Sequence, residues 1–266
     1  MCGTCGCSAE ASADLPPAGS PVPTPPRPGA PTGGPPARLP SRRLQLEQRL
    51  LAHNDGQAAA NRDRFQRSGV RVVNLLSAPG SGKTSLLEAL APCQPPLRQA
   101  VLVGDLATDN DARRLRAAGL PAVQITTGSL CHLEAWQVAE GLSRLEAAGH
   151  PLEGLDLLWI ENVGNLVCPA AFDLGEELRL VLLSVGEGED KPLKYPALFH
   201  SADVVAISKI DLAAAVGFRH GQASRAIAQV APRARIVEIS ARSGQGLGEL
   251  MTLLLGVEGR TTAPAA

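Results

Sequence analysis

Short apolar runs that alternate with helix-like stretches constrain the fold of this chain more than any other feature. In order, the runs are VRVVNLLSA, QAVLVGD, AVQITTG, LDLLWIENVG, LRLVLLSVGE, ADVVAISKID and ARIVEISA. Runs that are apolar throughout are typical of strands buried on both faces. The sequence therefore predicts an α/β fold, with a mainly parallel sheet flanked by helices and a ligand site beyond the carboxyl ends of the strands.

Composition narrows the class of protein. Apolar residues make up 44% of the 266 residues, which is enough for a buried core. The formal net charge of −1 gives no broad basic field for nucleic acid or an anionic membrane. No stretch resembles a signal peptide or reaches membrane-spanning length. We therefore expect a cytoplasmic protein that binds neither nucleic acid nor membrane.

The amino-terminal part of the chain differs from the rest. Residues 8–40 contain eleven of the 22 prolines and almost no large apolar side chains. Such a composition predicts a disordered, semi-stiff linker, because it buries too little surface to offset its ordering entropy. The linker separates a cysteine-rich segment at residues 1–7 from a domain expected at residues 41–258, and residues 259–266 are expected to form a disordered tail.

The first segment of the domain is SRRLQLEQRLLAHNDGQAAANRDRF. Ser41 is a candidate helix cap, and the leucines that follow recur at roughly helical spacing. Asn54-Asp55-Gly56 has the composition of a turn. We therefore expect a helix, a turn near residues 54–56 and a second helix.

The segment SAPGSGKTS at residues 77–85 lies between a predicted strand and a predicted helix. Backbone N–H groups at such a helix start can surround a polyphosphate, a lysine can reach the terminal phosphates, and a threonine hydroxyl can ligate Mg²⁺. Ser77 stands where the nucleotide-binding template has glycine. The predicted nucleotide-contacting residues are Gly80, Ser81, Gly82, Lys83, Thr84 and Ser85.

Two later segments favour GTP over ATP. AISKID at residues 206–211 resembles the NKxD signature of GTPases, with Ser208 in place of asparagine. Asp211 would accept hydrogen bonds from both guanine N–H donors, and Lys209 would flank the ring. The segment ISARSG resembles the loop that follows in GTPases, and its predicted contributors are Ser240, Ala241 and Arg242.

Two carboxylates follow apolar runs where Mg²⁺ chemistry needs them. Asp105 ends QAVLVGD, and Glu161 opens ENVG, which resembles the D-x-x-G switch motif. Phosphoryl transfer depends mainly on positioning and charge neutralisation. We therefore assign Asp105 to the attacking water and the Mg²⁺ shell, and Glu161 to the outer Mg²⁺ shell. Together with Lys83 they are the predicted catalytic residues, whereas a solvated helix start explains Asp109 and Asp111 equally well.

Soft metal ligands occur in two further segments. Cys131 and His132 are adjacent in TGSLCHLEA, and Cys168 lies four residues beyond Gly164 of the proposed switch. Thiolate and imidazole suit Zn²⁺ or Ni²⁺. Because Cys168 would move with the nucleotide-sensing segment, hydrolysis is expected to alter this metal site. Three more cysteines stand together at the start of the chain: Cys2, Cys5 and Cys7.

The segments NLLSAPGSGKTSLL, GDLATDNDARRL, TGSLCHLEA, IENVGNLVCPAAFDLGE, DKPLKYP and SKIDL, in this order, resemble the hydrogenase nickel-incorporation GTPases, the HypB family, over about residues 44–255. The start CxxCGC resembles the nickel motif of some members. The resemblance implies a P-loop GTPase fold of the SIMIBI type, a tight Ni²⁺ site at that motif, a weaker internal site that Zn²⁺ could also occupy, and GTP-dependent homodimers. It also implies two partners, a zinc-containing hydrogenase maturation protein and the hydrogenase large subunit.

The leading hypothesis is a GTP-hydrolysing metallochaperone that delivers nickel to a nickel–iron hydrogenase. The alternatives are a urease-maturation GTPase, a non-enzymatic nickel carrier or sensor, and an ATP-dependent small-molecule kinase. Lys191 and Lys194, in EGEDKPLKYP, either reach a partner's site or belong to a solvated loop.

Overall fold

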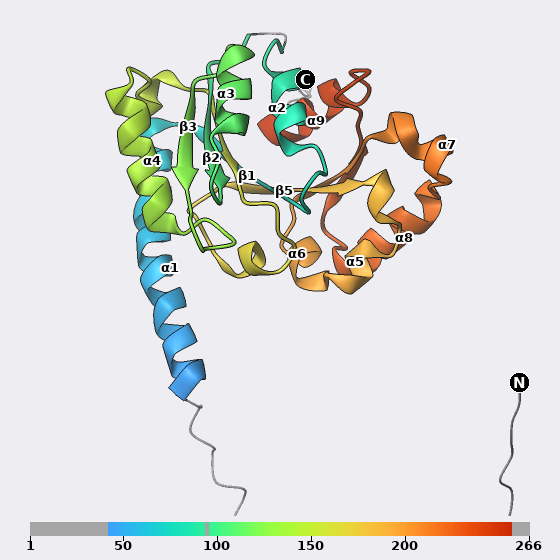
Figure 1. Cartoon of the computed structure of the whole chain (residues 1–266), viewed down its shortest axis with the longest axis horizontal. Coiled ribbons are helices and arrows are strands. Elements are labelled where there is room, and N and C mark those ends of the chain that lie inside the picture. The colour runs from blue at the N-terminus through green and yellow to red at the C-terminus, as the bar shows by residue number, and fades with distance from the viewer. Residues whose placement is uncertain (1–41, 94–95, 257–266) are drawn as a thin grey trace, which may run out of the picture. The chain divides into compact units, whose positions relative to one another are not determined.

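Seven parallel strands form one sheet in the part of the chain that the structure describes, in the order β3-β2-β4-β1-β5-β6-β7 (Figure 1). The structure is a computed structural model that describes residues 42–93 and 96–256. The predicted α/β fold with a mainly parallel sheet is confirmed. The strands are β1 (Arg71–Ser77), β2 (Gln99–Asp105), β3 (Ala122–Thr126), β4 (Leu157–Glu161), β5 (Leu178–Ser184), β6 (Val204–Ser208) and β7 (Arg235–Glu238).

Helices cover both faces of the sheet, so every central strand is buried on two sides (Figure 1). Apolar side chains of α2, α3 and α9 pack on one face. Those of α1 and α4 pack on one half of the opposite face, and those of α6 and α8 on its other half. The helices are α1 (Arg42–Ser68), α2 (Lys83–Leu90), α3 (Asn110–Ala117), α4 (Ala135–Ala147), α5 (Lys191–Lys194), α6 (Pro196–His200), α7 (Ala213–Val216), α8 (His220–Val230) and α9 (Leu247–Leu255).

The central strand β1 shows why its sequence is apolar throughout. Val73 and Leu75 point to the face covered by α2, α3 and α9, while Val72 and Leu76 point to the opposite face. Successive side chains of a strand alternate between faces, so a strand covered on both sides needs apolar residues at consecutive positions. The polypeptide leaves β1 at the carboxyl edge of the sheet and enters the glycine-rich loop directly.

The predicted break at residues 54–56 is wrong, because α1 is one uninterrupted helix of 27 residues. Asn54 is buried: its side chain donates to the carbonyl of Asp173 at 2.7 Å and accepts from the N–H of Ala135 at 2.8 Å. Two turns further along α1, Asn61 donates to the carbonyl of Ala135 at 2.8 Å. These tertiary hydrogen bonds override the low helix propensity of asparagine and of Gly56.

Several sequence predictions concern residues outside the described ranges. They include the cysteine cluster Cys2, Cys5 and Cys7, the linker at residues 8–40 and the tail at residues 259–266. Of the helices in residues 42–93 and 96–256, none combines the length and the apolar character that a bilayer span requires.

Candidate functional site

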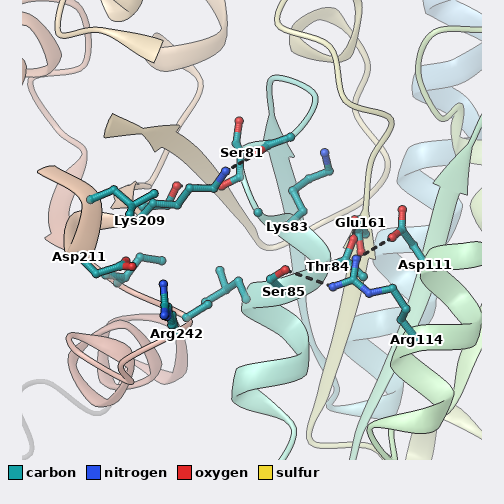
Figure 2. Close-up of a pocket in the computed structure, with 17 residues that line it drawn as sticks. Ser81, Lys83, Thr84, Ser85, Asp111, Arg114, Glu161, Lys209, Asp211 and Arg242 are labelled. Carbon is teal, nitrogen blue, oxygen red and sulfur yellow. Dashed lines mark hydrogen bonds and ion pairs between the residues drawn. The ribbon is translucent and has the colours of Figure 1, made fainter. Parts of the chain in front are cut away.

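A pocket of about 500 Å³ opens beyond the carboxyl ends of β1 and β6. Figure 2 shows Lys83 between two groups of side chains, with Lys209, Asp211 and Arg242 on one side and Thr84, Glu161 and Arg114 on the other. The predicted phosphate loop and the predicted base-binding segments therefore meet at one pocket. Its lining residues are Gly80, Ser81, Gly82, Lys83, Thr84, Ser85, Leu86, Asp111, Arg114, Glu161, Ser208, Lys209, Asp211, Leu212, Ile239, Ala241 and Arg242.

Glycine and serine shape the phosphate loop. Gly80 and Gly82 have φ angles of 73° and 100°, a left-handed conformation that side chains disfavour. The buried Ser77 fills the position where the template has glycine, and its Oγ accepts a hydrogen bond from Lys83 Nζ at 3.2 Å. Ser77, which replaces the glycine of the template, thus fixes the lysine side chain beside the loop. It does not itself line the pocket.

Two hydrogen bonds tie the phosphate loop to the ends of neighbouring strands. Ser208 Oγ, on β6, donates to the carbonyl of Ser81 at 2.9 Å. Ser81 Oγ donates to Glu187 Oε1 at 2.6 Å, and the same oxygen accepts from the N–H of Ser184 at 3.0 Å. Serine at position 208 therefore anchors the phosphate loop from the base-binding side. Glu187 was not predicted, because nothing in the sequence indicates that its loop reaches the phosphate loop.

Glu161 lies at the inner end of the pocket with a side chain that water hardly reaches. The residue is 3% exposed, and its Oε1 accepts a hydrogen bond from Thr84 Oγ1 at 2.8 Å. Its Oε2 is buried and has no hydrogen-bond partner among the described residues. Burial raises the pKa of Glu161 to about 7, although the nearby Lys83 ammonium acts in the opposite direction. An unpartnered carboxylate oxygen beside a threonine hydroxyl fits the surroundings of a hydrated divalent cation.

The raised pKa of Glu161 predicts a pH dependence of folding stability for the nucleotide-free protein. The folded state holds the proton up to about pH 7, whereas the unfolded state releases it near the ordinary value of 4.5. The free energy of unfolding should therefore fall as the pH rises from 4.5 to 7, by at most about 3 kcal/mol. Denaturant titrations across this range should show a flatter profile for Glu161→Gln. Parallel profiles of the two proteins would contradict the assignment.

Asp105 lies at the end of β2 and just outside the lining of the pocket. Its Oδ1 accepts hydrogen bonds from the backbone N–H groups of Ala107 at 3.0 Å and Thr108 at 2.7 Å. Partial burial alone would raise the pKa of Asp105, but these hydrogen bonds outweigh it and lower the pKa. The Asp105 carboxylate is therefore charged at neutral pH. Of the acidic residues at positions 105–111, Asp111 is the one that lines the pocket.

Arg114 was not predicted as a site residue, yet it lines the pocket from α3. Its guanidinium donates to Glu88 Oε2 at 2.6 Å. It also donates to Ser85 Oγ at 3.2 Å and to Asp111 Oδ1 at 3.3 Å (Figure 2). The only sequence signal was an acid and an arginine three residues apart on a predicted helix. That spacing does not reveal that the arginine points toward the phosphate loop.

The base-binding side of the pocket is built from two loops. Lys209 is the one non-glycine residue with positive φ in the described ranges, at 60°, and its Nζ donates to the carbonyl of Gly80 at 2.7 Å. Asp211 Oδ1 accepts a hydrogen bond from Ser240 Oγ at 2.7 Å. Ser240 thus acts on the orientation of Asp211 and does not itself line the pocket, whereas Ala241 and Arg242 do.

The predicted internal metal ligands come together although they lie on two separate loops. The ligand atoms of Cys131, His132 and Cys168 all lie within 4.8 Å of one another. The two Sγ atoms are 2.8 Å apart, and Asn165 Nδ2 donates to the carbonyl of Cys131 at 3.2 Å. Burial lowers the pKa of His132, which favours the neutral imidazole that binds metals. Two sulfurs and one imidazole nitrogen suit Ni²⁺ or Zn²⁺.

One loop connects this cluster to the nucleotide pocket. The loop at residues 161–168 starts at the buried glutamate and ends at the second cysteine. Gly164 packs so closely on the phosphate loop that a Cβ there would lie 2.9 Å from Pro79 Cα. Asn162 Oδ1 accepts a hydrogen bond from the N–H of Leu133, beside the first two ligands, at 3.1 Å. The loop therefore contacts both the phosphate loop and the segment that carries the first two ligands.

Comparison with known proteins agrees with this architecture. Residues 71–238 match the family described as CobW/HypB/UreG, nucleotide-binding domain. The hydrogenase maturation factor HypB of Azotobacter vinelandii is 52% identical over 213 residues, which cover 79% of this chain and 68% of that protein. The chain belongs to the HypB family.

Further members of the HypB family support the same placement. The hydrogenase/urease maturation factor HypB of Helicobacter pylori is 43% identical over 212 residues, covering 80% of this chain and 87% of that protein. The crystal structure of HypB from Helicobacter pylori in complex with nickel matches with a TM-score of 0.74 and 44% identity, over 77% of this chain and 94% of that one. The predicted resemblance to the HypB family is confirmed.

Proposed function

We propose that the protein is a GTP-hydrolysing nickel metallochaperone that delivers Ni²⁺ during the maturation of a nickel–iron hydrogenase. The observation that carries the proposal is the loop at residues 161–168, which begins at Glu161 in the nucleotide pocket and ends at Cys168 in the thiol–imidazole cluster. Membership of the HypB family and the nickel complex of a relative support it. We place the protein in the cytoplasm, where thiol ligands remain reduced.

In the proposed reaction, the glycine-rich loop binds the phosphates and Lys83 neutralises charge on the terminal ones. Thr84 would hold Mg²⁺ through its hydroxyl, with Asp105 in the Mg²⁺ shell and Glu161 in the outer shell, where the unpartnered Glu161 Oε2 could accept a hydrogen bond from a water of the ion. When bound, Mg²⁺ supplies further neutralisation of the phosphate charge. Asp105, which is held ionised at the end of β2, orients the attacking water.

The cargo in this proposal is Ni²⁺, held inside the domain by Cys131, His132 and Cys168. Movement of Cys168 with the loop at residues 161–168 changes the distance between its sulfur and the other two ligands, which would release or capture the ion. We propose that Zn²⁺ can occupy the same ligands, and that Cys2, Cys5 and Cys7 form a separate Ni²⁺ site. The proposed recipients are a zinc-containing maturation protein and the hydrogenase large subunit.

We further propose that GTP binding produces a homodimer. Lys194 Nζ lies 2.6 Å from Asp190 Oδ2 on an exposed surface, and Lys191 Nζ lies 5.4 Å from the centre of the Tyr195 ring. Both lysines therefore contact residues of their own chain. In the proposed dimer they would exchange these contacts for contacts with the second copy. Sedimentation with and without a non-hydrolysable GTP analogue tests the dimer.

The proposed function predicts two activities of the purified full-length protein. It should release phosphate from GTP in preference to ATP, and it should bind fewer Ni²⁺ equivalents when residues 1–7 are deleted, with unchanged hydrolysis. A protein that binds nickel without releasing phosphate would be a carrier or sensor. Phosphate release from ATP alone would indicate a kinase-like enzyme.

Base selection is expected to depend on Asp211. Asp211→Asn replaces an acceptor of two guanine N–H groups by an amide with one acceptor and one donor. The preference for GTP over ATP in competition binding should fall by about tenfold or more, since an unpaired buried donor costs 1–3 kcal/mol. Asp203→Asn, at the other end of β6 and outside the pocket, is the matched control. An unchanged preference in Asp211→Asn would place the guanine contact elsewhere.

A further inference from the structure

The ring of His132 is fixed on three sides. Its Nδ1 faces the metal cluster, 3.9 Å from Cys131 Sγ. Its face packs on Phe172 with the ring centres 3.8 Å apart. Its Nε2 lies 3.8 Å from Glu134 Oε1. That nitrogen is buried and has no hydrogen-bond partner among the described residues, so the nearby carboxylate is a group available to accept a hydrogen bond from it.

Glu134 is itself held in place. Its Oε2 accepts a hydrogen bond from Trp136 Nε1 at 2.6 Å, which leaves Oε1 toward the imidazole. Its backbone N–H donates to Gln137 Oε1 at 2.9 Å, at the start of α4. Its carboxylate is therefore positioned by the helix start and by an indole, and not by the cysteines.

We propose that Glu134 is a positioning residue for the metal site: its carboxylate accepts a hydrogen bond from the Nε2–H of His132, so that Nδ1 presents its lone pair to the metal beside Cys131 and Cys168. Metal-bound imidazoles commonly donate their second N–H to a carboxylate, which fixes the tautomer and increases ligand basicity. The inference rests on the proposed metal-binding function. It assigns Nδ1 of His132 as the nitrogen that binds the metal and Glu134 as the group that selects this tautomer.

The geometry separates this role from two others. Glu134 Oε1 lies near Nε2 of the ring and Cys131 Sγ lies near Nδ1, so the carboxylate is not placed as a fourth ligand when Nδ1 binds. The other role is that Glu134 only stabilises the start of α4. A helix cap changes stability, whereas a positioning carboxylate also changes metal affinity and the identity of the bound nitrogen.

The affinity test uses full-length protein carrying Cys2→Ser, Cys5→Ser and Cys7→Ser, so that the internal site reports alone. Ni²⁺ affinity is measured by competition with a metallochromic chelator in this parent, in Glu134→Gln and in Glu140→Gln. Glu140 is an exposed acid on α4, so its variant removes the same charge without touching His132. We expect Glu134→Gln to bind Ni²⁺ 10–100-fold more weakly, in line with the loss of outer-shell carboxylates, and Glu140→Gln to match the parent.

A second measurement identifies the ligating nitrogen without any substitution at Glu134. Long-range ¹H–¹⁵N correlation spectra of ¹⁵N-histidine-labelled, Zn²⁺-loaded parent should show metal on Nδ1 and a proton on Nε2 of His132. Metal on Nε2, or equal affinities in Glu134→Gln and Glu140→Gln, would overturn the inference. A parent that binds neither Ni²⁺ nor Zn²⁺ would instead overturn the metal site of the proposed function.

Discussion

Replacing Lys83 by alanine is expected to slow GTP hydrolysis by at least about 10²-fold, the size of effect seen when one preorganised donor to a developing charge is removed. The half-buried Lys83 lies at the phosphate loop, where partial loss of solvent lowers the pKa of its ammonium and Ser77 Oγ accepts a hydrogen bond from it at 3.2 Å. It is the single basic residue of the phosphate-loop segment at residues 77–85. A screened surface charge would contribute far less.

Single-turnover phosphate release separates this effect from binding. The rate constant of Lys83→Ala should fall more than its GTP affinity, because the charge that Lys83 meets increases in the transition state. Arg67→Ala is the control, since it removes an exposed cation on α1 that does not line the pocket. Equal losses of GTP affinity and turnover would show that Lys83 binds the ground state alone.

Replacing Cys168 by alanine is expected to weaken Ni²⁺ binding at the internal site by more than the 10–100-fold typical of lost outer-shell partners, because a direct ligand disappears. The same variant should abolish any difference in Ni²⁺ affinity between the GDP-bound and GTP-bound protein. Coupling between two sites requires contacts that differ between the two states, and Cys168 is the ligand on the loop that leaves the nucleotide pocket.

Cys93→Ala is the matched control for Cys168→Ala. Cys93 follows α2, and its Sγ accepts a hydrogen bond from Gln99 Nε2 at 3.3 Å, outside the metal cluster. Nickel titrations should use the protein in which Cys2, Cys5 and Cys7 are serine, in both nucleotide states. Nucleotide-dependent affinity that persists in Cys168→Ala would show that coupling runs through the loop of His132 instead.

The sheet and the phosphate loop could be predicted because their signals are local. A doubly buried strand needs consecutive apolar residues, and the glycines of the loop adopt positive φ angles whatever their distant surroundings. The continuous α1 could not be predicted in this way. Asn54 and Gly56 favour a turn in an isolated peptide, and only hydrogen bonds to residues more than 80 positions away reverse that preference.

Site residues that depend on side-chain direction were harder to predict. Arg114 points to the phosphate loop from α3, and Glu187 reaches Ser81 across 106 positions of the chain. Neither direction is encoded by spacing along the sequence. Ligand chemistry and the place of Cys168 in the proposed switch indicated Cys131 and Cys168 as partners, in agreement with the family resemblance, although the two residues are 37 positions apart. The fold brings their two Sγ atoms to 2.8 Å from each other.

The strand order has a consequence for how the chain is made. Both neighbours of β1, the strands β4 and β5, are synthesised later, starting at Leu157 and Leu178. A nascent chain that has emerged from the ribosome only as far as α3 therefore contains β1 without its two partner strands. It also contains the phosphate loop without the later segments that line the pocket. Contacts so distant in sequence form slowly, and an unpaired strand favours aggregation. The centre of the sheet can therefore close only after β4 and β5 have been synthesised, and until then β1 is exposed to contacts with other chains.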